Sequence, residues 1–363
     1  MDRSWRIVLR TMACMGLVAV CLAVACTSRR GIEPGPVKYN IYAATSGDTG
    51  LIFVVDADSF VVVDSIEVGY FVWSMVVTPD GRTIIAEIQV PEEYGARTIA
   101  IDVATKTIRQ SPEGSHGYTG SLLLLDKGRL VVRECWDLVY LDPASLDVIG
   151  ADSMQVLYAT GDPEGNVIAG ATGPPTALRV YDVRSRTVLH EFKPRTIDGD
   201  TVAYVGRVVL HPDGRRALVL AQAASRHALF MVVDLETQAT VFQSSLVTDQ
   251  GEIGITPGGG CAIVTDPGVP ESYILVGTVD VFALDPPAHL LRLNRNDMGA
   301  TAISQIRFIA GTTTAILAPR FRTPGAVCEF DWEELALKRR IDAIGFDGLA
   351  AVAVGPASGR AEH

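Results

Sequence analysis

The residues best suited to chemistry include an arginine and a glutamate that stand at matching places of a repeating chain. Arg207 and Glu252 each precede a turn glycine, Gly214 and Gly259, by seven residues. Matching places in adjacent repeats would bring the guanidinium and the carboxylate together. Such a pair serves either as a structural ion pair or as a clamp for a ligand. The sequence alone leaves both roles open.

Local motifs for catalysis are absent from the sequence. There is no H-x-H or H-E-x-x-H pair for a metal ion, no C-x-x-C-H for haem, no G-x-S-x-G nucleophile turn, and no glycine-rich phosphate loop before a helix. Only His116 and His227 among the histidines fall in long irregular segments. We therefore expect no cofactor and no metal, although distant loop residues could still converge on an acid–base or metal site.

Candidate binding residues lie mainly in segments of variable length between predicted strands, because such loops on a rigid scaffold usually carry function. For each of them a solvated loop or a packing role is the alternative, and for Trp73 that role is packing between repeats. The candidates are aromatic, charged and histidine side chains: Trp73, Glu92, Glu93, Tyr94, Arg97, His116, Tyr118, Arg207, His227, Glu252, Tyr273, Arg320 and Arg322.

An aspartate that ends a strand-like run recurs seven times and reveals the elements that must position these residues. The intervals are 46, 40, 40, 52, 51 and 46 residues, and in five cases a Ser or Thr stands three places on. An Asp that opens a tight turn accepts hydrogen bonds from N–H groups just ahead of it. We predict a structural hairpin role, and no catalytic role, for Asp56, Asp102, Asp142, Asp182, Asp234, Asp285 and Asp331.

Each repeat contains four short apolar strands, with a Pro–Gly turn such as Thr78-Pro79-Asp80-Gly81 between the first two. Repeats of 40–50 residues with four strands are typical of propeller blades. The sequence predicts an all-β, seven-bladed β-propeller over residues 37–359. The first repeat lacks its innermost strand, and the segment 349–354 near the C-terminus supplies one, so we expect the two ends of the chain to share a blade and close the ring.

A family resemblance rests on three phrases, VVDADSFVVVDSIEVG, SMVVTPDGRTIIAE and TIAIDVATKTI. They resemble the YVTN-type propeller repeats of bacterial and archaeal surface proteins. The match extends over residues 37–359 and is strongest in the first two blades. The resemblance implies a secreted or surface propeller and leaves its ligand open.

The N-terminal segment is predicted to be an export signal. Arg3, Arg6 and Arg10 precede an uncharged run over residues 12–26. This run is shorter than the about 20 apolar residues that a helix needs to span a bilayer. The run ends in Leu22-Ala23-Val24-Ala25-Cys26, which resembles a bacterial lipobox with Ala where Leu is commonest. The resemblance implies removal of residues 1–25 and lipidation of Cys26. An ordinary signal peptide or an uncleaved anchor is the alternative.

The remaining segments complete the predicted organisation. Residues 26–36 form a flexible tether that begins with the lipidated cysteine, and residues 360–363 form a tail. Thr27 follows the cysteine where the inner-membrane retention signal of lipoproteins has Asp. This favours the outer membrane of the bacterial envelope if the host has two membranes.

The composition of the 363 residues bounds the partners. With 48% hydrophobic residues, 20% charged residues and a formal net charge of −11, the chain is globular, and it lacks the basic excess of a sequence-independent nucleic-acid binder. We expect a monomer that contacts the membrane through its lipid and binds no nucleic acid.

We expect the propeller to be a non-catalytic scaffold that binds a protein, a glycan or a small ligand through its variable-loop face. The alternative is a metal-dependent hydrolase or lyase, similar to propeller lactonases, that uses His116, His227 and loop carboxylates at the channel mouth. A redox propeller of the quinoprotein kind is a third hypothesis.

Overall fold

The computed structural model describes residues 37–45, 50–90, 95–111, 121–134, 137–153, 156–162, 165, 167–172, 176–224, 227–246, 251–266, 270–271, 274–275, 278–294, 297, 303, 305–318, 326–341 and 349–357. Contacts divide the chain into two units, Met1–Val37 and Lys38–His363. Among the described residues of the second unit, no helix is long and apolar enough to cross a membrane.

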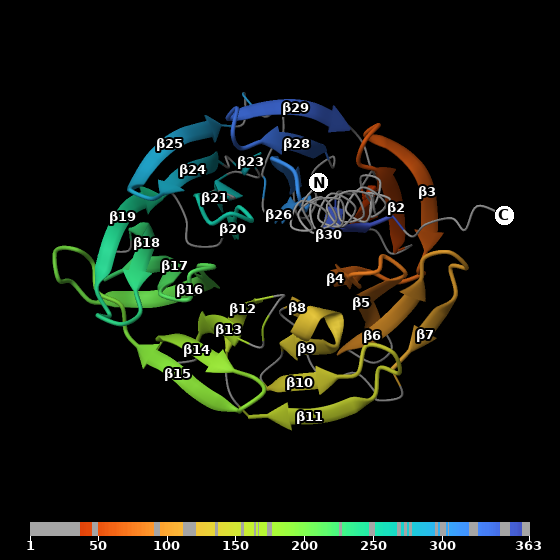
Figure 1. Cartoon of the computed structure of the whole chain (residues 1–363), viewed down its shortest axis with the longest axis horizontal. Helices are drawn as coiled ribbons and strands as arrows, with labels where there is room; N and C mark the ends of the chain where they lie inside the picture. Colours follow the sequence, from red (N-terminus) through yellow and green to blue (C-terminus); the bar gives the residue numbers. More distant parts are fainter. Residues whose placement is uncertain are drawn as a thin grey trace, which may run out of the picture. The chain divides into compact units, whose positions relative to one another are not determined.

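The second unit consists of seven four-stranded antiparallel sheets, which we number as blades 1–7 in chain order (Figure 1). From the axis outward, blade 1 contains β30 (Leu349–Pro356), β1 (Tyr39–Thr45), β2 (Leu51–Asp56) and β3 (Val61–Glu67). Blade 2 contains β4 (Val72–Val77), β5 (Thr83–Val90), β6 (Gly95–Asp102) and β7 (Ile108–Gln110). Blade 3 contains β8 (Ser121–Leu125), β9 (Leu130–Glu134), β10 (Leu138–Leu141) and β11 (Val148–Asp152), and blade 4 contains β12 (Leu157–Gly161), β13 (Val167–Ala171), β14 (Leu178–Asp182) and β15 (Thr187–Phe192).

The other three blades repeat this order. Blade 5 contains β16 (Val202–Leu210), β17 (Arg216–Ala223), β18 (Ala228–Asp234) and β19 (Thr240–Leu246). Blade 6 contains β20 (Ile253–Ile255), β21 (Cys261–Asp266), β24 (Thr278–Leu284) and β25 (Pro287–Asn294), and blade 7 contains β26 (Gln305–Phe308), β27 (Thr314–Ala318), β28 (Val327–Asp331) and β29 (Ala336–Ile341). The predicted all-β, seven-bladed propeller is confirmed.

The core lies between neighbouring blades, which explains the strand sequences. A middle strand is covered on both faces and reads as an almost continuous apolar run, so β17 is buried from Ala217 to Ala221. The outermost strands face solvent, and β3 is exposed from Val61 to Asp64. Between blades 5 and 6 the rings of Phe230 and Phe282 stack with centroids 4.5 Å apart. Each blade therefore depends on its neighbours for burial.

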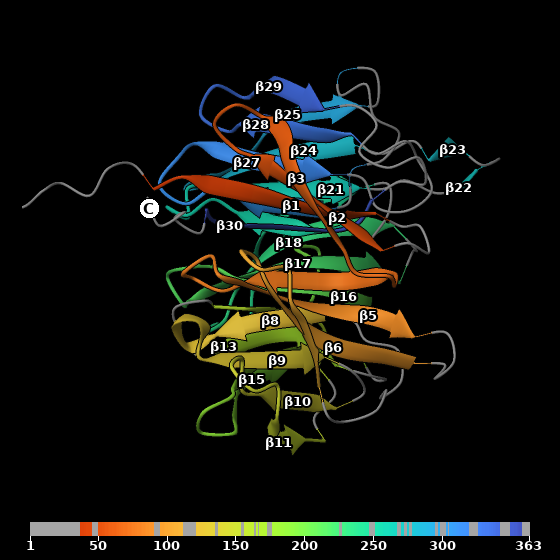
Figure 2. The ribbon, with the colours of Figure 1, turned by 90° about the vertical axis from the view of Figure 1, so that its right-hand side faces the viewer.

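The ring closes through the two ends of this unit, as predicted. In blade 1, β30 pairs antiparallel with β1, with Tyr39 opposite Pro356 and Ala44 opposite Ala351 (Figure 2). The pairing continues past the strands, because the Ala357 N–H donates to the Lys38 carbonyl at 2.7 Å. Closure leaves no inner edge of β1 open for aggregation.

The recurring aspartates lie at the turn between the third and the outer strand in all seven blades, and in six of them the carboxylate accepts hydrogen bonds within the turn. Asp56 shows the pattern, since its Oδ1 accepts hydrogen bonds from both the N–H and the hydroxyl of Ser59, each at 2.7 Å. The residue four places after the aspartate adopts the left-handed conformation, which reverses the chain into the outer strand. In these six hairpins φ is between 53° and 64°, at Phe60, Lys106, Leu146, Arg186, Gln238 and Leu335.

The prediction is wrong for the carboxylate of Asp285. In the other hairpins the carboxylate accepts the N–H three residues on, and at Asp142, Asp182 and Asp331 it also accepts the N–H two residues on. Two residues after Asp285 stands Pro287, which has no N–H, and β25 already begins there. The turn at Asp285 is therefore tight and does not use its carboxylate as a hydrogen-bond acceptor within the part of the chain that the structure describes.

One predicted loop has structure of its own. Between β21 and β24, β22 (Pro270–Glu271) pairs with β23 (Ile274–Leu275) as a small separate hairpin. Figure 2 shows this hairpin projecting from the ring on the side of the loops that connect second and third strands.

Deleting residues 346–363 should destabilise the whole ring. The deletion removes β30, exposes the edge of β1 and takes away the buried side chains of Leu349 and Val352. We expect the Tm, measured by circular dichroism, to fall by at least about 10 °C. Deletion of residues 360–363 alone is the control and should leave the Tm unchanged, and an unchanged Tm in the longer deletion would refute closure by β30.

The Asp102→Ala variant should lose about 1 kcal/mol of unfolding free energy, because its carboxylate accepts both the N–H and the hydroxyl of Thr105. Asp285→Ala is the matched control and should lose much less, since its turn does not use the carboxylate. Urea denaturation measures both values. Equal losses in the two variants would contradict the hairpin role of the carboxylate.

Candidate functional site

A cavity of about 850 Å³ lies on the axis of the ring. It is lined by residues of β4, β8, β12, β26 and β30, together with Arg207 and Glu252. The lining extends to turns that follow inner strands, at Pro79, Lys127 and Ala310. A volume of this size suits a small organic ligand. We call it the channel cavity.

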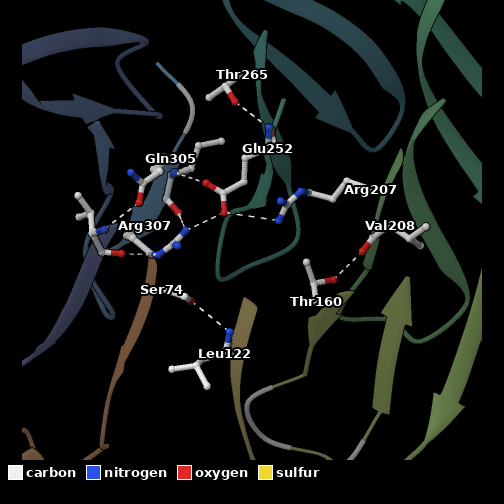
Figure 3. Close-up of polar contacts among 11 residues, drawn as sticks. Ser74, Leu122, Thr160, Arg207, Val208, Glu252, Thr265, Gln305 and Arg307 are labelled. Carbon is white, nitrogen blue, oxygen red and sulfur yellow. Dashed lines mark hydrogen bonds and ion pairs between the residues drawn. The ribbon is translucent and has the colours of Figure 1, made fainter. Parts of the chain in front are cut away.

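Three charged residues in the wall of this cavity, Arg207, Glu252 and Arg307, form a cluster (Figure 3). Arg307 donates from Nη1 to Glu252 Oε1 at 2.8 Å, and the Ile306 N–H donates to Glu252 Oε2 at 2.7 Å. Arg207 Nη1 lies 3.8 Å from the same Oε1 atom, which confirms the predicted ion pair as a charge contact without a hydrogen bond. The cluster joins blades 5, 6 and 7.

The surroundings of Glu252 keep its carboxylate charged. The side chain is only 14% exposed, and this burial raises its pKa. The charges of Arg307 and Arg207, with the hydrogen bonds from Arg307 and Ile306, lower it by more. The net result is a pKa below the ordinary value of glutamate, so Glu252 is an anion at neutral pH.

Arg307 is fixed by further bonds. Its Nε donates to the Val352 carbonyl of β30 at 2.9 Å, and its Nη1 also donates to the Ile306 carbonyl at 2.6 Å. Gln305 accepts the Val352 N–H at 2.8 Å through its side-chain oxygen. Polar side chains of β26 therefore bridge to the closing strand in blade 1.

Two neutral bridges continue around the axis. The Leu122 N–H of β8 donates to the Ser74 hydroxyl of β4 at 3.1 Å, and the Thr160 hydroxyl of β12 donates to the Val208 carbonyl of β16 at 2.7 Å (Figure 3). These bonds satisfy backbone groups that adjacent inner strands cannot pair, because neighbouring blades are separate sheets.

The rest of the lining is largely apolar. Trp73 contributes a ring that packs edge-on against Phe71, with centroids 4.7 Å apart. Leu123 and Val77 contribute aliphatic surface, and Ala351 and Ala353 of β30 contribute small methyl side chains. The cavity therefore combines apolar walls with a concentrated charge cluster, an arrangement common in ligand sites.

The structure brings together some of the predicted site residues. Trp73, Arg207 and Glu252 line the cavity. Arg97 on β6 instead donates to the Gln110 side chain of β7, and His227 is an exposed residue of the β17–β18 connection. Cys26, Glu92, Glu93, Tyr94, His116, Tyr118, Tyr273, Arg320 and Arg322 lie outside the described residues.

Sequence reasoning missed two cationic residues of the lining. Arg307 lies four residues before Gly311, so the seven-residue spacing that identified Arg207 and Glu252 does not select it. Lys127 occupies the 3₁₀ turn Asp126–Gly128 at the cavity, a position that the sequence analysis does not select. A search for every charged residue near the end of an inner strand would have found both.

Two other charged clusters lie on third and outer strands, away from the channel cavity, and are structural. Asp152 Oδ2 accepts both the Tyr140 and the Tyr181 hydroxyl at 2.6 Å, joining blades 3 and 4, and burial together with the Asp152 hydrogen bond raises the pKa of Tyr181 to about 12. Asp280 is fully buried and accepts from His289 and Arg292 at 2.7 Å. Within the described chain, no group of three or more His, Cys, Asp or Glu side chains is arranged to hold a metal ion.

Comparison with known proteins supports the fold. No family model and no curated protein matches the chain. Among solved structures it is similar to the dihydro-haem d1 dehydrogenase NirN in complex with DHE, at 16% identity and a TM-score of 0.55, over 90% of this chain and 77% of that one. It is also similar to the hydrazine synthase of Kuenenia stuttgartiensis, at 14% identity and a TM-score of 0.60, over 79% of this chain and 90% of that one. At these identities the likeness shows the propeller fold alone, and the YVTN-type resemblance stays a prediction.

Arg307→Met should cost about 2 kcal/mol of unfolding free energy at neutral pH, since it leaves the Glu252 carboxylate without its hydrogen-bonded cation. Arg207→Met should cost less than about 1 kcal/mol, because its charge contact is 3.8 Å long. Guanidinium denaturation measures both losses.

The cost of Arg307→Met should also depend on pH. A carboxylate whose folded pKa is lowered stabilises the fold above its unfolded pKa and loses that contribution as the pH falls through the folded value. The difference between wild type and Arg307→Met should therefore shrink in acid. A difference that stays constant down to pH values below the folded pKa would contradict the assignment.

Proposed function

We propose that the chain is a lipid-anchored protein outside the cytoplasm, whose propeller is a non-catalytic binding scaffold. The lipid is attached to Cys26, residues 27–36 form the tether, and the bacterial outer membrane is the site of anchoring. The ligand is a protein, a glycan or a small molecule, and it is bound at the axis, in the channel cavity. The lining of this cavity extends to the turns after inner strands, on the side opposite the loops that connect second and third strands, so binding at the variable-loop face stays a separate prediction.

The observation that carries the binding role is the channel cavity. It is large enough for a small molecule and is built on the inner strands of a closed ring. Rigid elements hold binding groups more accurately than loops do. The sequence predicts Arg207, Glu252 and Trp73 as binding residues, and all three contribute to the wall of the cavity.

The anchoring role is supported by the sequence of the first 36 residues. A basic start, a short apolar run and a cysteine after small residues form the pattern of a lipoprotein signal. Two or more acyl chains on one cysteine give stable attachment, whereas one chain binds a membrane only marginally. Thr27 after the cysteine favours the outer membrane.

A hydrolase or lyase that uses a divalent metal is the second candidate function. It would need His116, which lies outside the described residues, and His227, which is exposed in a loop of blade 5. Stoichiometric metal in the purified full-length chain would favour this enzyme over the scaffold. A visible absorption band would instead favour a redox propeller.

The Cys26→Ser variant should lose its lipid and move from the membrane fraction to the soluble fraction. We expect wild type expressed in a Gram-negative host to incorporate an alkyne-labelled fatty acid and to fractionate with the outer membrane. Cys14→Ser, which changes another cysteine of the signal, is the matched control and should be labelled like wild type. Labelling of the Cys26→Ser variant would refute the anchor.

A further inference from the structure

Arg207 has hydrogen-bonding capacity that the ring does not use. Its guanidinium carries five N–H donors, yet its contact with Glu252 is 3.8 Å long and, among the described residues, it makes no hydrogen bond. The side chain is 20% exposed and lines the channel cavity. A guanidinium in this position can donate two parallel hydrogen bonds to a planar or tetrahedral oxyanion.

We propose that the channel cavity binds a small organic oxyanion, a carboxylate or a phosphate with an apolar body, through the guanidinium of Arg207. This inference rests on the proposed binding role of the propeller and names the chemical class of its ligand. The oxyanion occupies the side of the guanidinium that Glu252 leaves open, and the apolar body contacts the lining that includes Trp73 and Leu123.

The charges of the lining favour an anion. The charged residues among the described lining are Arg207, Arg307, Lys127 and Glu252, three cations and one anion, although the chain as a whole has a formal net charge of −11. Glu252 contacts both arginines and offsets one of their two charges, so Arg207 and Arg307 keep a net positive charge beside it. A second carboxylate entering the cavity is therefore attracted by the cluster.

Arg307 and Arg207 play different parts in this site. Arg307 donates from Nε to the Val352 carbonyl and from Nη1 to the Glu252 carboxylate and the Ile306 carbonyl. Its side chain is therefore held by both blade 1 and blade 6. Glu252 is anchored by Arg307 and by the Ile306 N–H. The two residues hold each other in place, and Arg207 remains available to the ligand. Arg307→Met is therefore a test of stability, and Arg207→Met is a test of binding.

Three probes of one shape separate charge from apolar contact: benzoate, benzyl alcohol and benzylammonium. Calorimetric titration of the full-length chain should give a Kd for benzoate on the order of millimolar. Benzyl alcohol should bind at least about tenfold more weakly, and benzylammonium should not bind detectably, because charge-assisted bonds to an arginine favour the anion. Inorganic phosphate and hexanoate, tested as competitors of benzoate, distinguish a phosphate site from a carboxylate site.

Variants assign the binding to Arg207. Arg207→Met should weaken benzoate at least about tenfold and leave benzyl alcohol unchanged, and Arg207→Lys should lose most of the same affinity because a lysine lacks the two-pronged geometry. Arg179→Met is the matched control. Arg179 is 16% exposed and pairs with Glu191, on β14 and β15 of blade 4. The Arg179→Met variant should therefore bind benzoate as wild type does. Glu252→Gln removes the resident anion and should tighten benzoate severalfold.

The outcomes separate this inference from the proposed function. Equal affinity for benzoate and benzyl alcohol, or unchanged benzoate binding in Arg207→Met, overturns the oxyanion site while the channel remains a binding cavity. No benzoate binding at about tenfold above the expected Kd also overturns it. Stoichiometric metal, or fatty-acid labelling of the Cys26→Ser variant, overturns the proposed function without bearing on Arg207. Near-native circular dichroism of each variant shows that a loss of affinity is not a loss of fold.

Discussion

Pairing between β30 and β1 is the constraint on which the molecule depends. It joins residues more than three hundred positions apart in the chain, and until it forms, β1 presents an open edge and blade 7 lacks its hydrogen bonds to β30. β30 also holds two polar side chains of blade 7 at the channel. Val352 of β30 donates its N–H to Gln305 and accepts Arg307 through its carbonyl. Closure of the ring and placement of the charge cluster are therefore one event.

The channel is held by two different kinds of bridge. On one side, blades 5, 6, 7 and 1 are joined through Arg207, Glu252, Arg307 and Gln305. On the other side, single hydroxyl groups, such as that of Ser74, join blades 2 and 3 and blades 4 and 5. A neutral hydroxyl satisfies a backbone group at little desolvation cost, whereas buried charges need partners on every side. A binding function can therefore be assigned to the charged side of the channel, where blades 5, 6, 7 and 1 are joined, from the residues already present there.

Much of the fold could be predicted from the sequence because one physical requirement recurs in every blade. A hairpin from the third to the outer strand needs an acceptor for the N–H three residues on, and an aspartate supplies it at Asp56 and five other positions. The rule fails at Asp285 because β25 already begins at Pro287, so the residue three places on belongs to the outer strand. Arg207 and Glu252 were found because both occupy the same register before a turn glycine. Arg307 reaches the cluster from another register, and the direction of a long side chain in a channel does not follow from spacing.

The location of charge explains how an acidic protein can hold an anion. Exposed charges are screened over about 8 Å at physiological salt, so the negative exterior governs solubility and encounter more than the energy at the axis. Arg207 is largely shielded from solvent, at 20% exposure, and its charge is screened less. Within the cavity the local excess of cations decides what stays bound, and the ring keeps those cations apart from the acids outside. A closed, rigid scaffold is the condition for that separation, because a ring that opened would expose Glu252 and Arg307 to water and weaken both contacts.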